Sequence, residues 1–351
     1  EEEREEEEDV DASAAAAPSP LYRYEGQMEE LLAHGHGGRP LLPPLDEQRY
    51  QFWRVLVTAL RSGGTIDLYL DHMTGATVAA KRVPRGHLRE NPEAYRRNNP
   101  NDPEDPWQEI AIARILGSPG PQRLACTAAS HGAFLSRQGD LLLVSEYLPG
   151  GDLFELASSL GEPGSARERK AWPVVTSLLE AVHDLHIRGI AHGDISLENA
   201  LLRRGCNGGV VLVDFGMAVT VDLPHTSVIR GKSSYQAPEM HTQETYNARY
   251  ADLFACGVAA YALAIGGYPW SSTRPGKCIA FGFAQRHGLE QFLQRKRIPV
   301  SGGVHKAAAD CLSPQYRRLL EVLLDFEPSK RQAVMSIGGS DFIHQEVLLG
   351  G

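Results

Sequence analysis

The sequence predicts an α+β protein with two lobes, a small lobe of mainly antiparallel strands with one long helix and a larger, mainly helical lobe. Two observations carry this prediction. Short apolar segments between turn residues dominate residues 50–146, whereas apolar residues at helical spacing dominate residues 147–348. The 351 residues, 42% of them apolar, are enough for one large lobe or two coupled lobes. Strands followed by helices are typical of an α+β fold.

The first 49 residues are expected to lie outside both lobes. Residues 1–20 are an acidic block followed by Ala and Pro, a composition that predicts a disordered tail, and residues 21–49 are expected to form an N-terminal extension. The first nine residues account for −7 of the net charge of −9. Because the remaining chain is nearly neutral, we expect no broad nucleic-acid surface, which needs clustered cations.

The small lobe is expected to contain five strands and the long helix. Residues 84–106, rich in Asn, Pro and Arg, are predicted to be an insertion, and apolar spacing over residues 107–116 predicts the helix that follows it. The expected strands are residues 52–60, 65–70, 77–83, 134–135 and 141–144.

The large lobe is expected to begin after a linker at residues 146–150. Apolar residues at helical spacing predict helices over residues 174–190, 250–265 and 314–324, and residues 200–202 and 210–213 predict a hairpin. The five cysteines show no Cys-x-x-Cys pair, so neither a zinc site nor a disulfide framework is indicated. No run of eighteen apolar residues predicts a membrane span. A first residue other than Met suggests a missing leader, and no location is predicted.

The loop between the first of these helices and the hairpin carries the strongest chemical signal. Residues 192–199 read HGDISLEN, residues 214–216 read DFG after the second hairpin strand, and residues 237–239 read APE. Any one of these motifs is weak alone. In this order they supply a carboxylate base, an amide and a second carboxylate, the groups that phosphoryl transfer requires. The chain therefore resembles the protein kinase superfamily.

This resemblance implies a role for each of five residues. Asp194 resembles the base that accepts the proton of the attacking hydroxyl, and Asn199 and Asp214 resemble the ligands of Mg²⁺, with Mn²⁺ as an alternative. Lys81 resembles the strand lysine that contacts the inner phosphates of ATP, and Glu109 is the carboxylate expected to hold it. The implied partners are ATP and protein substrates; Ser/Thr against Tyr specificity and the oligomeric state are left open.

The nucleotide-binding segments match the kinase pattern only in part. Of the three glycines that cover the phosphates, Gly63 alone is present, so ATP is expected to be held differently. At the adenine end, the resemblance implies that Ser145 is the gatekeeper residue and that backbone groups of Glu146 and Leu148 bind the purine. Asp152 is expected to accept a hydrogen bond from the ribose.

Two departures from the kinase pattern affect activity. Gly193 replaces the arginine that reads a phosphorylated activation loop, which predicts activity without loop phosphorylation. Ser196 and Lys232 stand where the family usually has a lysine and a threonine, so the cation and the hydroxyl have exchanged places. We expect Lys232 to stabilise the transferring phosphoryl group; a lysine that faces the substrate is the alternative.

Structural anchors are also implied. Glu239 is expected to pair with Arg331 beneath the activation segment, and Asp252 is expected to brace the catalytic loop.

Within the superfamily, the missing glycine loop, Trp107 before Glu109 and the DISLEN segment look most like FIKK kinases, which would imply phosphorylation of protein Ser, Thr or sometimes Tyr. Two alternatives stay open. Aminoglycoside and choline phosphotransferases share an HGD motif with Asn five residues later, but they lack an APE segment and its arginine partner. A non-catalytic pseudokinase would explain the broken glycine loop, but not the complete base and metal residues.

Overall fold

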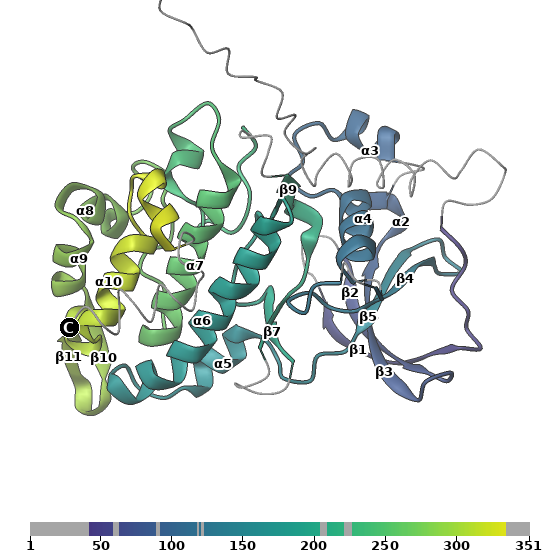
Figure 1. Cartoon of the computed structure of the whole chain (residues 1–351), viewed down its shortest axis with the longest axis horizontal. Coiled ribbons are helices and arrows are strands. Elements are labelled where there is room, and N and C mark those ends of the chain that lie inside the picture. Colours follow the sequence, from purple (N-terminus) through teal and green to yellow (C-terminus); the bar gives the residue numbers. More distant parts are fainter. Residues whose placement is uncertain are drawn as a thin grey trace, which may run out of the picture.

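The computed structural model shows two lobes side by side, with the strands β1 to β5 in one and most helices in the other (Figure 1). It describes residues 42–58, 63–88, 92–117, 119–120, 123–203, 209–220 and 227–334. The predicted tail at residues 1–20 and most of the extension at residues 21–49 lie outside the described residues, as does the end of the large lobe beyond residue 334. The α+β class predicted from the sequence is confirmed.

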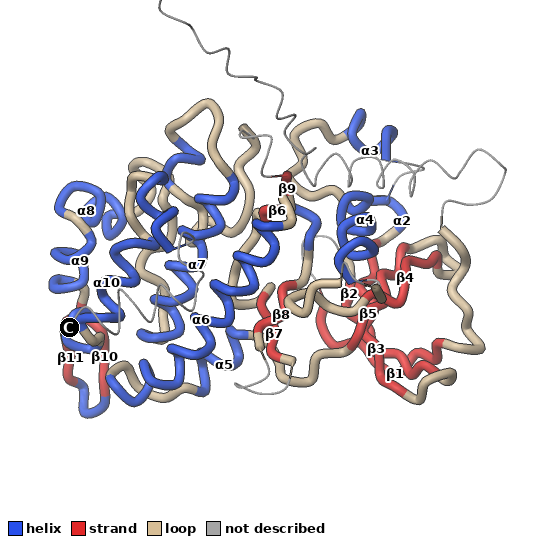
Figure 2. Tube along the Cα trace, in the orientation of Figure 1, coloured by secondary structure: helices blue, strands red, loops and turns tan. Residues whose placement is uncertain are grey.

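The small lobe is built on one antiparallel sheet of five strands in the order β1-β2-β3-β5-β4 (Figure 2). Leu142 and Val144 of β5 pack with Val78 and Ala80 of β3 on one face. The strand bounds are β1 Tyr50–Thr58, β2 Thr65–Asp71, β3 Ala76–Val83, β4 Ser130–Leu135 and β5 Leu141–Glu146. Strand β4 begins four residues earlier than expected, because a bulge between Ser130 and Gly132 lets the chain continue pairing with β5.

Helix α4 (Pro106–Gly117) covers the other face of the sheet and carries Glu109. Trp107 and Ile110 are buried in a cluster with Ala133 and Leu141, and the indole Nε1 of Trp107 donates to Leu88 O at 2.8 Å. The insertion predicted at residues 84–106 contains two short helices, α2 (Arg85–Leu88) and α3 (Pro92–Asn98), which its Pro and Asn content did not predict.

The large lobe is mainly helical and packs around the buried helices α6 and α7. Helix α6 begins nine residues before the predicted start and continues through Pro173. Arg167 in its first turns is buried and donates to Leu263 O at 2.6 Å, so tertiary contacts hold the part that the proline would otherwise interrupt. The bounds are α5 Leu153–Ser159, α6 Ser165–Ile187, β6 Ile190–Ala191, β7 Ala200–Leu202, β8 Val210–Leu212, β9 Val219–Thr220, α7 Ala248–Ile265, α8 Ile279–His287, α9 Leu289–Arg295, β10 Arg297–Val300, β11 Val304–Ala307 and α10 Pro314–Leu323.

Helix α7 is the one described helix that is long and apolar enough to cross a membrane. Within the fold, 89% of that window is buried. A helix at the centre of a large lobe has the same length and composition, so this helix is weak evidence for a span.

Candidate active site

The loop that carries HGDISLEN lies between β6 and β7, and Asp252 of helix α7 holds its first residues. The carboxylate of Asp252 accepts from the backbone nitrogens of His192 at 2.7 Å and Gly193 at 2.9 Å. The ring Nε2 of His192 lies 2.9 Å from Val213 O, next to Asp214. Asp252 is 2% exposed, and the predicted bracing role is confirmed by these bonds. One buried carboxylate therefore fixes two consecutive backbone amides at the start of the loop.

Asp194 and Asn199 contact each other directly. The amide Nδ2 of Asn199 donates to Asp194 Oδ2 at 2.8 Å and to Asp194 O at 2.9 Å, and Val213 N donates to Asn199 O at 3.1 Å. The second carboxylate oxygen, Asp194 Oδ1, is buried and has no hydrogen-bond partner. Burial raises the pKa of Asp194 to about 6. An unpartnered carboxylate oxygen beside the cleft is an acceptor that is available to an incoming proton.

Lys81, Glu109 and Asp214 form an ion cluster between the lobes. The Nζ of Lys81 lies 2.8 Å from both oxygens of Glu109 and 2.6 Å from Asp214 Oδ1. Burial alone would lower the pKa of Lys81, but the two carboxylates outweigh it and raise that pKa above its usual value. Lys81 in turn lowers the pKa of Asp214 against the effect of burial. Burial raises the pKa of Glu109 to about 7, although Lys81 opposes this shift. The three groups therefore share one site, and the sequence order predicted the contact of Lys81 with Glu109 but not the contact with Asp214.

Asp214 also has an unusual backbone conformation. Its φ of 66° makes it the only non-glycine with positive φ among the described residues. A single residue held in the left-handed region costs about 1–3 kcal/mol, and such residues gather at functional sites. Its side chain is 43% exposed, much more than that of Glu109 at 8%. The strained backbone thus holds a partly exposed carboxylate at the cleft.

The oxygens of this site fit Mg²⁺ bound together with a nucleotide. The amide nitrogen of Asn199 is used by Asp194, which leaves its oxygen for a cation, and Asp214 keeps one carboxylate oxygen that Lys81 does not bind. In the described part of the chain, no three His, Cys, Asp or Glu side chains gather into a metal site. Mg²⁺ commonly uses one or two protein oxygens with substrate phosphates and water, so this donor set suits it.

The adenine-binding residues predicted from the sequence lie at and after the end of β5. Ser145 pairs with Ala79 in the sheet, and Leu148 is buried. The backbone nitrogen of Glu146 donates to Ala129 O at 2.8 Å, so a purine would have to meet its carbonyl instead.

Two other predicted nucleotide contacts have less direct support in the geometry. Asp152 caps α5 by accepting from Glu155 N at 2.8 Å, so one of its oxygens already has a structural partner. Gly63 has φ of 65°, and a Cβ there would meet nothing within 4 Å. Its conformation favours glycine, but no close approach requires one among the described residues.

Lys232 and Ser196 are brought together, as the proposed exchange requires. Lys232 Nζ donates to Ser196 Oγ at 2.9 Å and lies 2.8 Å from Glu198 Oε2. Lys232 also contributes an electrostatic effect that lowers the pKa of Asp194, against the larger effect of burial. The cation is therefore close enough to the catalytic loop to act on the same reaction.

The activation segment is anchored by a buried ion pair. Arg331 donates to both oxygens of Glu239, at 2.6 and 2.9 Å, and is 0% exposed. This pair was predicted from the sequence and is confirmed. Arg230 was not predicted: its guanidinium donates to Pro103 O at 2.7 Å and to Met217 O at 3.2 Å. No sequence motif marks it, because backbone carbonyls occur at every residue.

Comparison with known proteins agrees with this geometry. A model of the protein kinase domain matches residues 62–343, which is most of the chain. The chain belongs to the protein kinase family. The kinase is 28% identical over 298 residues to the serine/threonine-protein kinase SAPK3 of rice, a match that covers 83% of this chain and 76% of SAPK3.

Two further relatives match over shorter stretches. The serine/threonine-protein kinase SRK2J of Arabidopsis thaliana is 35% identical over 198 residues, covering 56% of this kinase and 53% of SRK2J. The CBL-interacting protein kinase 31 of rice is 34% identical over 169 residues, covering 46% of this kinase and 34% of the relative. These names support the protein kinase superfamily, and none of them carries the FIKK name.

Proposed function

We propose that this kinase transfers the γ-phosphoryl group of ATP to Ser or Thr hydroxyls of proteins, with Asp194 as the base. The observation that carries the proposal is the buried, unpartnered Oδ1 of Asp194, held beside Asn199. The relatives' names, serine/threonine-protein kinases, support the same substrate class. Transfer to Tyr is an alternative that substrate profiling would detect.

Each residue has a distinct task in this reaction. The substrate oxygen attacks the γ-phosphorus as the bond to the ADP oxygen breaks, and the hydroxyl proton passes to Asp194 Oδ1. Lys81 binds the inner phosphates, and Glu109 holds the lysine in place through two contacts of 2.8 Å. Asn199 and Asp214 would hold Mg²⁺, which when bound neutralises charge on the phosphates.

Lys232 is proposed to supply a cation near the transferring group. The ammonium is fixed by Ser196 at 2.9 Å and Glu198 at 2.8 Å, so it is oriented before substrate arrives. A fixed charge near developing negative charge stabilises the transition state more than a mobile one. Ser196 would act by holding this lysine.

The substitution Asp194→Asn tests the proposed base. We expect transfer of labelled phosphate from ATP to a protein substrate to fall by about 10²–10⁴-fold, because an amide cannot accept the proton. The thermal unfolding midpoint should not fall, since Asn has nearly the same shape. The matched control is Asp310→Asn, an exposed carboxylate in the large lobe, which should leave transfer unchanged.

The same assay separates the alternative functions. A small-molecule phosphotransferase would label metabolites but no protein, and a pseudokinase would label nothing. The pseudokinase reading is motivated by Gly63, the one glycine left of the phosphate-covering loop. The FIKK-like resemblance stays a prediction that rests on the sequence motifs alone.

A further inference from the structure

Gly193 occupies a position where no side chain fits. Its φ is 76°, and a Cβ built there would lie 2.2 Å from Met217 O. Real Cβ atoms essentially never come that close to backbone, so the catalytic loop and the start of the activation segment touch directly at this point. The arginine that the kinase pattern has at this position would force these two segments apart.

Arg230 lies against the same spot from the other end of the activation segment. Its Cδ is 3.5 Å from the position that a Gly193 Cβ would take. Its guanidinium donates to Met217 O at 3.2 Å, just after the DFG motif, and to Pro103 O at 2.7 Å, just before α4. One side chain therefore joins the late activation segment, its beginning and the insertion that leads into the helix of Glu109.

Neighbouring bonds connect the same segments. Asp105 N donates to Gly216 O at 2.8 Å, and Gly231 N lies 3.3 Å from the sulfur of Met217. Tyr246 OH donates to Val228 O at 2.9 Å and holds the chain that precedes Arg230. None of these contacts needs a phosphate group, so the segment is fixed by neutral donors and one permanent cation.

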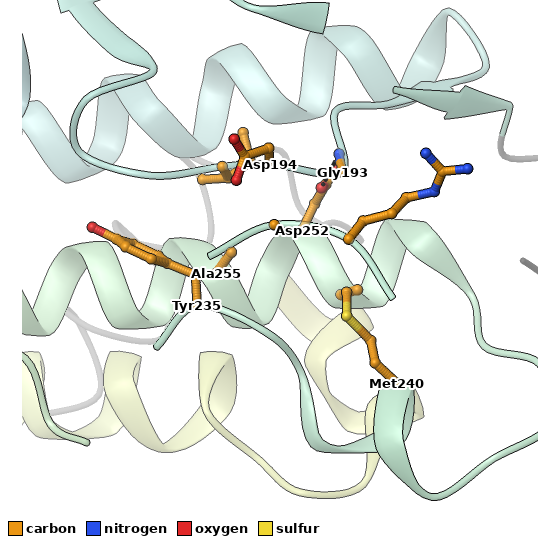
Figure 3. Close-up of a pocket in the computed structure, with 10 residues that line it drawn as sticks. Gly193, Asp194, Tyr235, Met240, Asp252 and Ala255 are labelled. Atoms are coloured by element: carbon orange, nitrogen blue, oxygen red, sulfur yellow. Dashed lines mark hydrogen bonds between the residues drawn. The ribbon is translucent and has the colours of Figure 1, made fainter. Parts of the chain in front are cut away.

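Arg230 also lines a pocket beneath the catalytic base. This small hollow lies between the catalytic loop, the activation segment and α7. Figure 3 shows Gly193 and Asp194 of the loop above Asp252 and Ala255 of α7. A shift of Arg230 would therefore loosen the wall directly below Asp194, and the loss would reach the base itself.

We propose that Arg230 is a positioning residue that holds the activation segment in its catalytic arrangement without phosphorylation. It acts through Met217 and Pro103 and not on the substrate. In the usual kinase arrangement, a phosphate on the activation segment pairs with an arginine at the position that Gly193 occupies here. In this kinase, Arg230 takes over that holding role by donating to the backbone carbonyls of Met217 and Pro103. This inference rests on the proposed kinase function and adds how the site is regulated.

Three substitutions test this role in protein that is dephosphorylated and checked by mass spectrometry. Arg230→Met keeps the aliphatic part of the side chain and removes the hydrogen-bond donors. Arg230→Lys keeps the positive charge but has one donor nitrogen in place of the three of a guanidinium. The matched control is Arg167→Met, because Arg167 is a buried arginine that also donates only to carbonyls, far from the cleft. Turnover, KM for ATP and amide hydrogen exchange are measured for each.

We expect Arg230→Met to lower kcat by about 10–10²-fold with little change in KM, since small displacements of catalytic groups cost this much. Arg230→Lys should recover part of the loss. The amide of Asp105, which donates to Gly216 O, should exchange faster in Arg230→Met and not in Arg167→Met.

Several results would overturn the inference. Arg230→Met could have the kcat of wild type, or Arg167→Met could lose as much kcat as Arg230→Met. The hydrogen-exchange rate of the Asp105 amide could be the same in Arg230→Met and wild type. The wild-type enzyme could also be active only after an upstream kinase has phosphorylated it. A wild type that transfers no phosphate under any condition would refute the proposed function instead. In that case the exchange rate of the Asp105 amide still decides whether Arg230 holds the segment.

Discussion

Two groups of charged residues in the described part of the chain, Arg331 with Glu239 and the acidic residues of the cleft, differ in how completely their polar atoms are paired. Beneath the activation segment, the three guanidinium nitrogens of Arg331 all donate, to Glu239 and to two backbone carbonyls. At the cleft, Asp194 keeps one oxygen with no partner, and Asp214 is 43% exposed with a left-handed backbone. The first group lies in the large lobe, whereas the second lies between the lobes.

For these two groups, we interpret complete pairing as a structural role and incomplete pairing as a reactive one. A buried ion pair in which every donor is used has nothing left to offer a ligand, and breaking it leaves an uncompensated charge. A carboxylate with a free oxygen has already lost water without gaining a partner, so it gains by accepting a proton or a ligand. We therefore expect substitutions in the first group to cost stability and those in the second to cost turnover.

The largest expected effect on stability comes from Arg331→Met. Removing the guanidinium leaves Glu239 buried and unpaired, which should lower the free energy of unfolding by about 3–5 kcal/mol. Thermal and urea unfolding followed by circular dichroism measure this loss. The control is Lys330→Met at the neighbouring residue, whose side chain is 68% exposed and which should change stability by less than about 0.5 kcal/mol. An Arg331→Met protein as stable as wild type would contradict the comparison.

Lys232→Ala is expected to have the next largest effect, and on turnover. Loss of the cation near the transferring phosphoryl group should lower kcat by about 10²-fold with the unfolding midpoint unchanged, because Lys232 is 40% exposed. Steady-state phosphate transfer measures this. Lys277→Ala removes an exposed lysine elsewhere and should be neutral.

A double exchange sharpens the Lys232 prediction. Ser196→Lys combined with Lys232→Thr restores the usual kinase arrangement and should be more active than Lys232→Ala alone. If Lys232→Ala keeps wild-type kcat and changes only the KM for the protein substrate, the lysine faces the substrate and the exchange idea is wrong.

The sequence predicted the parts of the fold that apolar periodicity determines. Strands β2 and β3 and helix α4 follow from alternation and helical spacing, and the order of the kinase motifs pointed to the contact of Lys81 with Glu109. The start of α6 before Pro173 was missed, because buried contacts of Arg167 override a local helix breaker. Local rules carry no information about such distant partners.

The contacts around Gly193 could not be predicted for a different reason. Arg230 binds the carbonyls of Pro103 and Met217, and every residue offers a carbonyl, so nothing in the residue types marks the pair. The need for glycine at 193 depends on where Met217 O lies, which is a property of the folded loops. Motif spacing identifies side chains that act on substrate, but not the backbone that holds them.

His186 is an exception within the structural region and gives the smallest expected effect. Its Nε2 lies 2.9 Å from Asp252, but its Nδ1 is buried without a partner. Burial lowers the pKa of His186; Asp252 opposes this shift, whereas the nearby Arg249 and His183 favour it. A proton on Nδ1 would be a buried donor with no acceptor, so the folded protein holds this ring neutral.

The stability of the kinase should therefore fall as the pH drops below about 6.5, the ordinary pKa of histidine in the unfolded chain, because that chain then binds a proton that the folded state refuses. One such group contributes at most about 1.4 kcal/mol per pH unit. His186→Gln keeps a donor for Asp252 but cannot titrate, so urea unfolding between pH 7.5 and 5.5 should show a shallower loss than in wild type. His305→Gln, at an exposed histidine, should leave the slope as in wild type. If His186→Gln and wild type lose stability in parallel over this range, the unpartnered ring nitrogen has no effect on the free energy of unfolding. An unpaired buried atom would then be energetically neutral at this site, and incomplete pairing alone would not identify a reactive group.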